Sequence, residues 1–182
     1  MIQKYTNEEI KQGKPTVAEV LQKPRTPVHV VLDNIRSIYN VGAIFRTCDA
    51  LLAEKMYLCG ITGHPPRKDI DKVALGAVEV VPWEYSSSVR ETLLKLKEKG
   101  IKICALEQTR ESVCYREARF PFPCALVVGN EVEGVSDEVM PLVDMAVDIP
   151  MLGRANSLNV ATAFGIVGYE MLAQWKRAGN SG

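Results

Sequence analysis

The chain has 182 residues and a formal net charge of zero, because 22 Lys and Arg residues balance 22 Asp and Glu residues. Its length suits a single domain with a buried core, and its hydrophobic content of 47% is ordinary for a globular protein. The zero net charge excludes a basic field over the whole molecule, so nucleic-acid binding would need a local patch. The candidate cations for such a patch are Lys4, Lys11, Lys14, Lys23, Arg25, Arg36, Arg46, Arg67, Lys68 and Arg154.

Few residues are suited to bind a metal, and no segment predicts membrane insertion. The two histidines, His29 and His64, are too few for a His-rich site, and the five cysteines form no Cys-x-x-Cys pair. The odd number of cysteines favours reduced thiols in a reducing compartment. No apolar run approaches the roughly 20 residues that cross a bilayer, and residues 1–10 lack the apolar core of a signal peptide. We therefore expect a cytoplasmic protein that binds no metal and no membrane.

The chain begins with a polar and charged segment that contains Pro15, Pro24 and Pro27. This composition predicts an arm over residues 1–27, with a short helix at 16–22. We expect the main domain to span 28–178 and a flexible tail to follow at 179–182.

Strands and helices alternate from residue 28 onward. Short apolar runs predict strands over 28–33, 56–59, 78–82, 101–106, 124–129 and 145–149. Apolar residues at helical spacing predict helices over 39–52, 68–75, 87–99 and 159–177. This alternation is typical of an α/β fold with a mostly parallel sheet and helices on both faces. Ligands of such sheets bind at the carboxyl ends of the strands, so the informative loops are 34–40, 107–110, 129–134 and 150–156.

The last of these loops lies between a short apolar strand and a helix that is apolar nearly all round. It contains Pro, Gly and Asn, which are typical loop residues, and Ser157 is a good candidate for the helix N-cap. Polar side chains held between two buried elements are either structural caps or parts of a binding site. The polar side chains in question are Arg154, Asn156, Ser157 and Asn159.

Several common catalytic motifs are absent. No Gly-x-Gly-x-x-Gly and no Gly-Lys-Ser/Thr follows the first predicted strand, which weakens the dinucleotide-binding and P-loop interpretations. Neither histidine lies in a polar loop after a strand, so no Ser/His/Asp or Cys/His set is convincing.

Three other segments each follow a predicted strand. The first is Asn40-x-Gly42-x-x-x-Arg46, which by itself is compatible with a capping Asn and a surface Arg. The second is the loop 129–134, Gly-Asn-Glu-Val-Glu-Gly, which by itself is compatible with a turn and solvated charges. The third is Ile-Pro-Met at 149–151 followed by Ser-Leu-Asn-Val at 157–160.

Together, over residues 28–172, the three segments resemble the SpoU/TrmH-like branch of the SPOUT RNA methyltransferases. The family motifs are Asn-x-Gly-x-x-x-Arg, Gly-x-Glu-x-x-Gly and Ile-Pro-Met with Ser-Leu-Asn-Val, and all three occur here in the family's order. The resemblance implies an α/β fold with a C-terminal trefoil knot, bound S-adenosylmethionine and a homodimer. It also implies methylation of a ribose 2′-hydroxyl in tRNA or rRNA.

The resemblance further assigns roles to individual residues. Backbone groups at five positions would hold the cofactor: Leu106, Gly129, Ile149, Met151 and Leu158. The side chains that match the family's catalytic positions are Asn40, Arg46, Glu131, Ser157 and Asn159. Contacts to RNA are expected from Arg36, Arg46 and Arg154. A guanidinium holds its proton up to about pH 12, so we interpret Arg46 as a clamp and electrostatic stabiliser rather than as a base.

Two alternative functions remain. One is a base methyltransferase of the same superfamily, against which the Asn40 and Arg46 pair and the Ser-Leu-Asn sequence at 157–159 argue. The other is an RNA-binding or assembly protein that keeps the fold without catalysis. The presence of Arg46, Glu131 and Asn159 argues against this second alternative.

Overall fold

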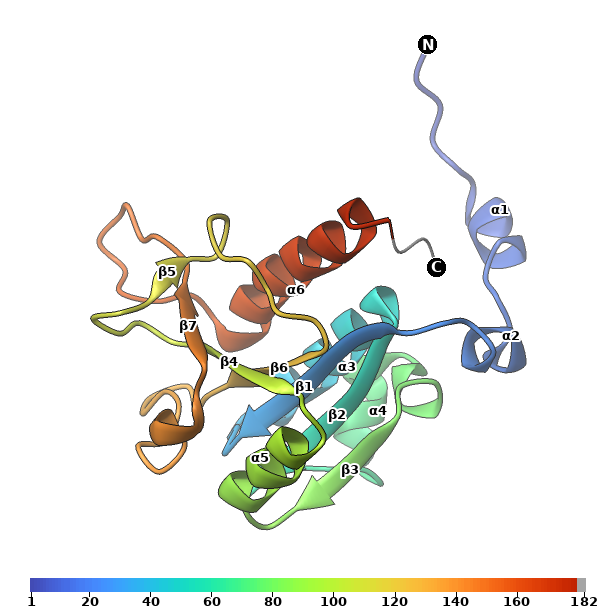
Figure 1. Cartoon of the computed structure of the whole chain (residues 1–182). Coiled ribbons are helices and arrows are strands. Elements are labelled where there is room, and N and C mark those ends of the chain that lie inside the picture. The colour runs from blue at the N-terminus through green and yellow to red at the C-terminus, as the bar shows by residue number, and fades with distance from the viewer. Residues whose placement is uncertain (180–182) are drawn as a thin grey trace.

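A seven-stranded sheet forms the centre of the computed structural model, which describes residues 1–179 (Figure 1). The strand order is β3-β2-β1-β6-β4-β7-β5, and every pair of neighbours is parallel. The strands are β1 Thr26–Asp33, β2 Ala53–Cys59, β3 Trp83–Ser86, β4 Lys102–Leu106, β5 Val113–Cys114, β6 Cys124–Val128 and β7 Met145–Asp148. The helices are α1 Asn7–Gln12, α2 Val17–Leu21, α3 Ile38–Leu51, α4 Lys68–Ala74, α5 Val89–Glu98 and α6 Val160–Arg177, with short 3₁₀ turns η1 Ala77–Glu79 and η2 Met140–Leu142.

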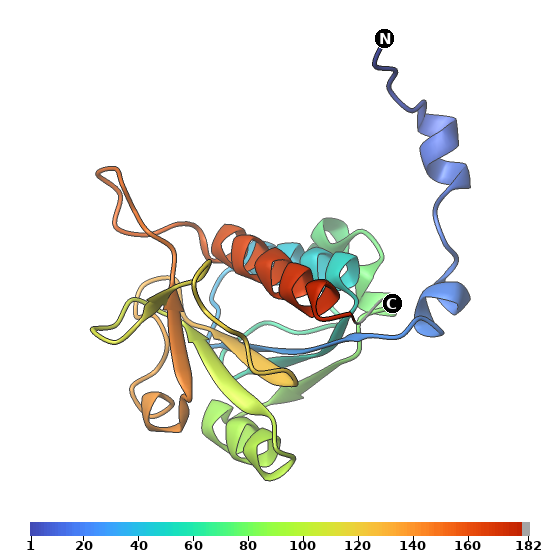
Figure 2. The same cartoon turned by 45° about the horizontal axis from the view of Figure 1, so that its top comes forward.

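Helices cover both faces of the sheet, as the sequence predicts. On one face α3 packs against α4 and α6, whereas α5 covers the other face beside β4, β1 and β2 (Figure 2). Adjacent strand residues therefore enter different cores: Leu32 packs with Phe45 and Phe164, and Val31 packs with Leu93. Burial on both faces explains why the strands read as continuous apolar runs.

One predicted strand is wrong. Residues 78 and 79 belong to the 3₁₀ turn η1, and β3 begins only at Trp83, although the Pro82 carbonyl already accepts a hydrogen bond from the Met56 amide of β2. The Ala77 carbonyl accepts hydrogen bonds from the amides of Val80 and Val81, and both valines are buried in the core. An apolar run of this length reports burial but does not fix the backbone conformation.

The alternation of strand and helix also ends after β4. Among the described residues, the segments 107–123 and 129–144 contain only the two-residue strand β5 and the turn η2. The sequence did not predict β5 or α1. These two long connections contain the polar loops 107–110 and 129–134, which lie at the carboxyl ends of β4 and β6.

The N-terminal arm projects from the body of the molecule (Figures 1 and 2). Each of its two helices starts with a capping box, formed by Thr6 with Glu9 and by Thr16 with Glu19. The helix predicted at 16–22 is confirmed as α2. Arg25 fixes the base of the arm by donating hydrogen bonds to the carbonyls of Ala53 and Val80. The tail predicted at 179–182 lies, beyond Gly179, outside the described residues.

The cysteines are free, and within residues 1–179 no helix is long and apolar enough to cross a membrane. Cys114 is half-buried and the other four cysteines are buried. Burial raises the pKa of the Cys59 thiol to about 11, so this thiol stays protonated at neutral pH.

Candidate active site

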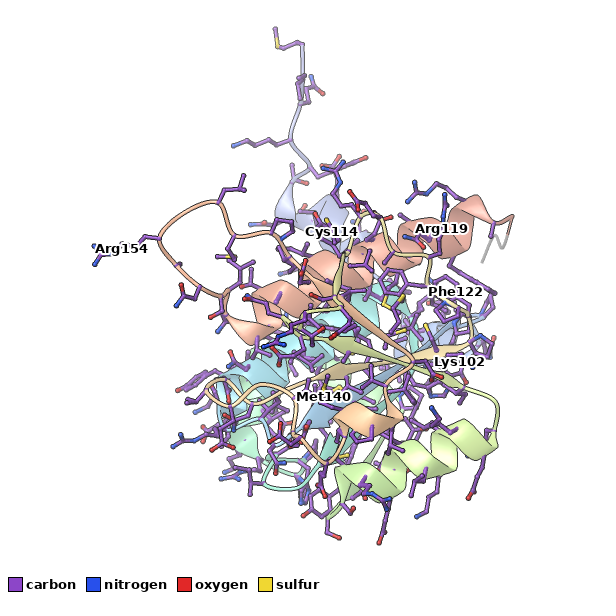
Figure 3. All side chains as sticks on the ribbon, turned by 60° about the vertical axis from the view of Figure 1, so that its left-hand side comes forward. Lys102, Cys114, Arg119, Phe122, Met140 and Arg154 are labelled. Carbon is purple, nitrogen blue, oxygen red and sulfur yellow. The ribbon has the colours of Figure 1, made fainter. Side chains whose placement is uncertain are left out.

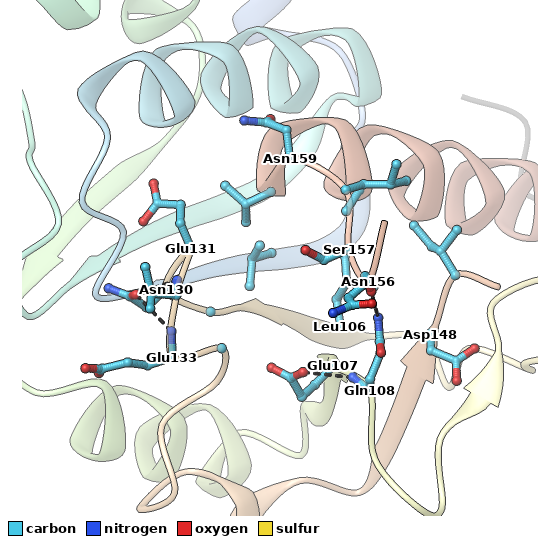
Figure 4. Close-up of a pocket in the computed structure, with 18 of the residues that line it drawn as sticks. Leu106, Glu107, Gln108, Asn130, Glu131, Glu133, Asp148, Asn156, Ser157 and Asn159 are labelled. Carbon is cyan, nitrogen blue, oxygen red and sulfur yellow. Dashed lines mark hydrogen bonds between the residues drawn. The ribbon is translucent and has the colours of Figure 1, made fainter. Parts of the chain in front are cut away.

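A cavity of about 690 Å³ opens at the carboxyl ends of β4, β6 and β7 (Figure 4). Four segments of the chain form its wall, and each follows a strand or precedes α6. The lining residues are Leu106, Glu107, Gln108, Val128, Gly129, Asn130, Glu131, Val132, Glu133, Gly134, Asp148, Ile149, Met151, Asn156, Ser157, Leu158, Asn159, Val160 and Ala163. Three of the four loops that the sequence singles out therefore meet at one place.

The loop after β6 folds back tightly on itself. Asn130 and Gly134 exchange two backbone hydrogen bonds of 2.9 Å. A Cβ on Gly129 would lie 2.2 Å from the backbone of Gly134, and a Cβ on Gly134 would lie 2.2 Å from the Glu107 carboxylate. Gly134 also has a φ of +72°, a conformation that favours glycine. Both glycines are therefore required for the close approach that shapes this wall of the cavity.

Glu131 joins this loop to the start of α3. Its carboxylate accepts hydrogen bonds from the backbone amides of Arg36 at 2.9 Å and Ser37 at 3.0 Å, and from Asn40 Nδ2 at 2.8 Å. Partial burial by itself would raise the pKa of Glu131, but these three hydrogen bonds outweigh it and hold the pKa below the ordinary value of 4.5. Glu131 is thus an anion at neutral pH whose oxygens are occupied in positioning other groups.

Asn40 and Asn159 extend the same network. Asn159 Nδ2 donates to Asn40 Oδ1 at 3.0 Å, while Asn159 Oδ1 accepts from the amides of Ala161 and Thr162 at the start of α6. A continuous relay therefore runs from the α6 N-terminus through Asn159 and Asn40 to Glu131. The N-cap of α6 is Asn159, so the predicted N-cap at Ser157 is wrong, and α3 is capped by Ser37 rather than by Asn40.

The loop before α6 is exposed, and one side-chain hydrogen bond ties it to the opposite wall. Gln108 Nε2 donates to the Asn156 carbonyl at 2.7 Å (Figure 4). Ser157 lines the cavity, and within residues 1–179 its hydroxyl has no hydrogen-bond partner. This hydroxyl is therefore available to a ligand.

The lining of the cavity combines apolar residues with acidic, amide and hydroxyl residues. Its acidic members are Glu107, Glu131, Glu133 and Asp148, and no Lys or Arg is among the described residues that line it. Within the same described part of the chain, no group of three His, Cys, Asp or Glu side chains is arranged to hold a metal ion. A cationic ligand with an apolar body matches this lining better than an anionic one.

A profile of the SpoU rRNA methylase family matches residues 27–169. The chain belongs to this family. A tRNA (guanosine(18)-2′-O)-methyltransferase of Aquifex aeolicus is 37% identical over 161 residues, which cover 88% of this chain and 76% of the relative. A 23S rRNA (guanosine-2′-O-)-methyltransferase of Neisseria meningitidis is 36% identical over 156 residues, which cover 83% of this chain and 59% of that relative.

Solved structures of the SpoU family share the fold. The crystal structure of an A. aeolicus TrmH/SpoU tRNA modifying enzyme has a TM-score of 0.81 and 35% identity, covering 94% of this chain and 85% of that one. The SpoU methyltransferase AviRb of Streptomyces viridochromogenes, solved in complex with the cofactor AdoMet, has a TM-score of 0.78 and 25% identity, covering 87% of this chain and 64% of the other.

Most of the SpoU motif residues lie at the cavity. The five positions that the resemblance assigns to the cofactor all line it, namely Leu106, Gly129, Ile149, Met151 and Leu158. Glu131, Ser157 and Asn159 line it as well, and Asn40 reaches it through its hydrogen bonds to Glu131 and Asn159.

The three arginines of the SpoU motifs and loops lie outside the cavity wall. Arg46 is exposed on α3, and within residues 1–179 it has no hydrogen bond or ion pair. Arg36 is exposed, and its own backbone amide donates a hydrogen bond to the Glu131 carboxylate. Arg154 projects from the 150–159 loop away from the body (Figure 3). These cations face solvent rather than the cavity, as groups that contact a large external substrate would.

The sequence patterns assign no role to several lining residues, among them Glu107, Gln108 and Asp148. Glu107 and Gln108 lie in the 107–110 loop, which was recognised as interesting because it follows a strand, but no role was assigned to either side chain. Glu107 accepts from the Val135 amide at 2.8 Å, a contact between residues far apart in sequence. The only signal was their position directly after β4.

Proposed function

We propose that this chain is an S-adenosylmethionine-dependent methyltransferase that methylates a ribose 2′-hydroxyl in tRNA or rRNA. The observation that carries this function is the convergence of two SpoU motifs on a single cavity, joined to the third through Asn40: Asn159, Asn40 and Glu131 form one hydrogen-bonded relay. The relatives named as tRNA and rRNA guanosine 2′-O-methyltransferases support the reaction and the substrate class.

The cavity fits S-adenosylmethionine, which has a flat adenine, a sulfonium cation and a charged amino-acid end. Apolar walls at Leu106, Ile149 and Leu158 suit the adenosine, and the acidic residues around the cavity favour a cation through their charge rather than by direct contact. Gly129 and Met151, which also line the cavity, complete the set of residues whose backbone groups would hold the cofactor. When bound, the cofactor supplies a methyl group on a sulfonium that needs no further activation.

The residues of the chain then act mainly by positioning. Glu131 fixes the first turn of α3 and orients Asn40, which in turn orients Asn159 at the cavity. The Ser157 hydroxyl is free to bond the ribose that enters beside it. Arg46 binds the RNA from α3 and stabilises the negative charge that develops on the attacking 2′-oxygen as its proton passes to solvent.

RNA binding is assigned to exposed cations, because the chain has no net charge to attract RNA as a whole. Arg36, Arg46 and Arg154 lie on three different segments around the cavity. The lysines of the arm, Lys4, Lys11, Lys14 and Lys23, are all exposed and extend this set away from the body.

Substituting Lys11 and Lys14 by Ala tests the arm. The affinity for RNA should fall while the affinity for S-adenosylmethionine stays unchanged. An RNA affinity equal to that of wild type would contradict the assignment.

The chain is further proposed to form the family's homodimer and trefoil knot. Tyr169 on α6 is 53% exposed, and Leu152 in the preceding loop is 98% exposed, which leaves apolar surface for a second copy. The knot would form where the chain leaves β7 and returns across the sheet to pack α6 on α3. The knot would be contradicted by a crystal structure in which the backbone can be pulled straight from its two ends without a knot.

Because tRNA and rRNA are the proposed substrates, we place the enzyme in the cytoplasm, which cell fractionation tests.

The decisive experiment compares ribose methylation maps of total RNA from cells with and without this protein. A ribose 2′-O-methyl group blocks alkaline cleavage of the next phosphodiester bond, whereas a base methyl group does not. One protected position that disappears without the protein is the expected result. Purified enzyme and labelled S-adenosylmethionine should restore it on the unmethylated RNA. Transfer of label without alkaline protection would identify a base methyltransferase instead.

A further inference from the structure

The loop after β6 is held by acidic residues from both neighbouring strands. In the sheet, β6 lies between β1 and β4. Asp33 is the last residue of β1, and Glu107 directly follows β4. Glu107 Oε2 accepts the Val135 amide at 2.8 Å, and Asp33 Oδ2 accepts the Ser136 amide at 2.8 Å. The backbone amides of Val135 and Ser136, at the end of the 129–136 loop, are thus hydrogen-bonded to carboxylates from the strands on either side of β6.

Asp33 is the more unusual of the two carboxylates, because it is fully buried. It accepts two further hydrogen bonds, from Ser136 Oγ at 2.9 Å and from Asn34 Nδ2 at 2.8 Å, and within residues 1–179 it has no ion pair. Burying a carboxylate without a cation is costly for folding, even when hydrogen bonds compensate. We therefore expect the role of this carboxylate to be the positioning of the 129–136 loop, to which it is bonded through Ser136.

The held loop carries one of the three motifs and contacts a second. Gly129 and Gly134 form one wall of the cavity, and Glu131 fixes the start of α3 and orients Asn40. A shift of Ser136 would move the cavity wall and the anchor of the relay together. Asp33 itself does not line the cavity, so any effect of Asp33 on a ligand has to pass through the loop.

We infer that Asp33 and Glu107 are positioning residues that preform the cofactor wall and the Asn159–Asn40–Glu131 relay before a ligand binds. Neither carboxylate is a catalytic residue in this arrangement. The inference rests on the proposed function in one respect, namely that S-adenosylmethionine is the ligand of the cavity.

The variant Asp33→Asn tests the inference because it keeps the size of the side chain. An asparagine has one acceptor oxygen, so it cannot accept from both the Ser136 amide and the Asn34 amide group as the carboxylate does. Affinity for S-adenosylmethionine, measured by calorimetry below the melting temperature of every variant, should fall roughly 10-fold or more, as expected when a hydrogen bond to a charged group is lost. Hydrogen exchange of the Val135 and Ser136 amides in the ligand-free protein should become faster.

Asp144→Asn is a control that makes the same change at the other end of the sheet, in a more exposed carboxylate. The Asp144 carboxylate accepts the Ile103 amide at 2.8 Å at the start of β4 and pairs with Lys97 and Lys102. Its loss should lower the melting temperature without changing the affinity for S-adenosylmethionine. If Asp33→Asn behaves like this control, Asp33 only stabilises the fold and the inference is overturned.

A second variant covers the case in which Asp33→Asn fails to fold. Ser136→Ala removes only the hydroxyl that bonds Asp33 Oδ1, so it should weaken cofactor binding in the same direction by a smaller factor. Where both single variants fold, the double variant should bind S-adenosylmethionine as tightly as Asp33→Asn alone. Both changes act through the same contact between Asp33 and Ser136, so their effects should not add. Unchanged affinity in Ser136→Ala would overturn the inference. Wild-type protein that binds no S-adenosylmethionine would instead refute the proposed function, while the exchange rates of Val135 and Ser136 would still decide whether Asp33 orders the loop.

Discussion

Single residues of the site divide into those that hold other protein groups and those left free for the substrate. Glu131, Asn40 and Asn159 have their polar atoms occupied by one another and by backbone amides. Arg46 and Ser157 have no such partners within the described residues. This division predicts different consequences when members of each group are changed.

Changing Arg46 should affect chemistry but not folding. Arg46 is exposed and does not line the cavity, so Arg46→Ala should leave the melting temperature and the affinity for S-adenosylmethionine nearly unchanged. The single-turnover rate of methyl transfer should fall about 10²–10³-fold, as expected when one donor to a developing oxyanion is lost. A variant that transfers methyl groups at the wild-type rate would refute the assignment of Arg46.

Arg46→Lys separates a clamp from a base. Lysine keeps the positive charge but lacks the planar fork of two donors, so a clamp should retain only a small part of its activity at every pH. A lysine amine has a pKa of about 10.4 in model peptides, so the Lys variant would recover activity at alkaline pH if the residue were a base. Single-turnover rates from pH 7 upward distinguish the two.

The contribution of Glu131 to the stability of the fold should be lost in acid. Its folded-state pKa is below the ordinary value of 4.5, so its stabilising contribution is present above that value and is lost as the pH falls through the folded-state pKa. Glu131→Gln should lower the melting temperature at pH 7, and the difference from wild type should shrink below pH 4.5. Melting curves between pH 7 and pH 3.5 check this, and a difference that stays constant in acid would contradict it.

At the scale of the elements, the site depends on how α3 and α6 begin. Ser37 caps α3, and Asn159 caps α6 while also reaching Asn40 on α3. The first turns of two helices that are distant in the sequence are thereby joined beside the cavity. The loop after β6 completes the arrangement through Glu131, so the geometry of the site is a property of element ends.

Two variants of Asn159 should separate its cap from its place in the relay. Asn159→Ala loses both and should cost about 1 kcal/mol of stability, the usual cost of an N-cap. Asn159→Asp keeps an acceptor for the amides of Ala161 and Thr162, but it has no N–H for Asn40. The Asn159→Asp variant should therefore be near wild type in thermal melting yet impaired in methyl transfer. Equal activity of this variant and wild type would show that the Asn40 contact is dispensable.

The tight turn after β6 should not accept a side chain at its start. In Gly129→Ala the new Cβ would meet the backbone at Gly134 and Val135 at 2.2 Å, and backbone cannot move aside without opening the cavity wall. Calorimetry should show loss of S-adenosylmethionine binding together with a lower melting temperature. Gly153→Ala is the control, because nothing lies within 4 Å of a Cβ at that position. Wild-type binding by Gly129→Ala would refute this account of the wall.

At the scale of the whole molecule, the face formed by α6 and the loop before it is the place for a second copy. Phe164, Val167 and Met171 are buried on the inner side of α6, whereas Tyr169 is half exposed. Sedimentation should show a dimer at micromolar concentration, and Tyr169→Glu should shift it toward monomer because a charge opposes burial. A wild-type monomer under these conditions would contradict the proposed assembly.

The sequence by itself determined the class of fold and the composition of the site. Apolar runs fix where chain must be buried, so β1, β2, β4, β6, β7 and the main helices lie where the patterns predict them. The second and third motifs name many of the residues that line the cavity because each follows a strand, and the carboxyl ends of parallel strands share one edge. The first motif joins the site through the hydrogen bonds of Asn40.

Only the tertiary structure decided which groups touch. The strand order places β6 between β1 and β4, so Asp33 and Glu107 reach the same loop although they lie far apart in the chain. Likewise residues 78–82 are apolar enough for a strand, but residues 78 and 79 lie in the turn η1, which packs against α3 and α4. Periodicity records which side chains avoid water; hydrogen-bond partners between distant segments depend on the order and register of the strands, which no local pattern encodes.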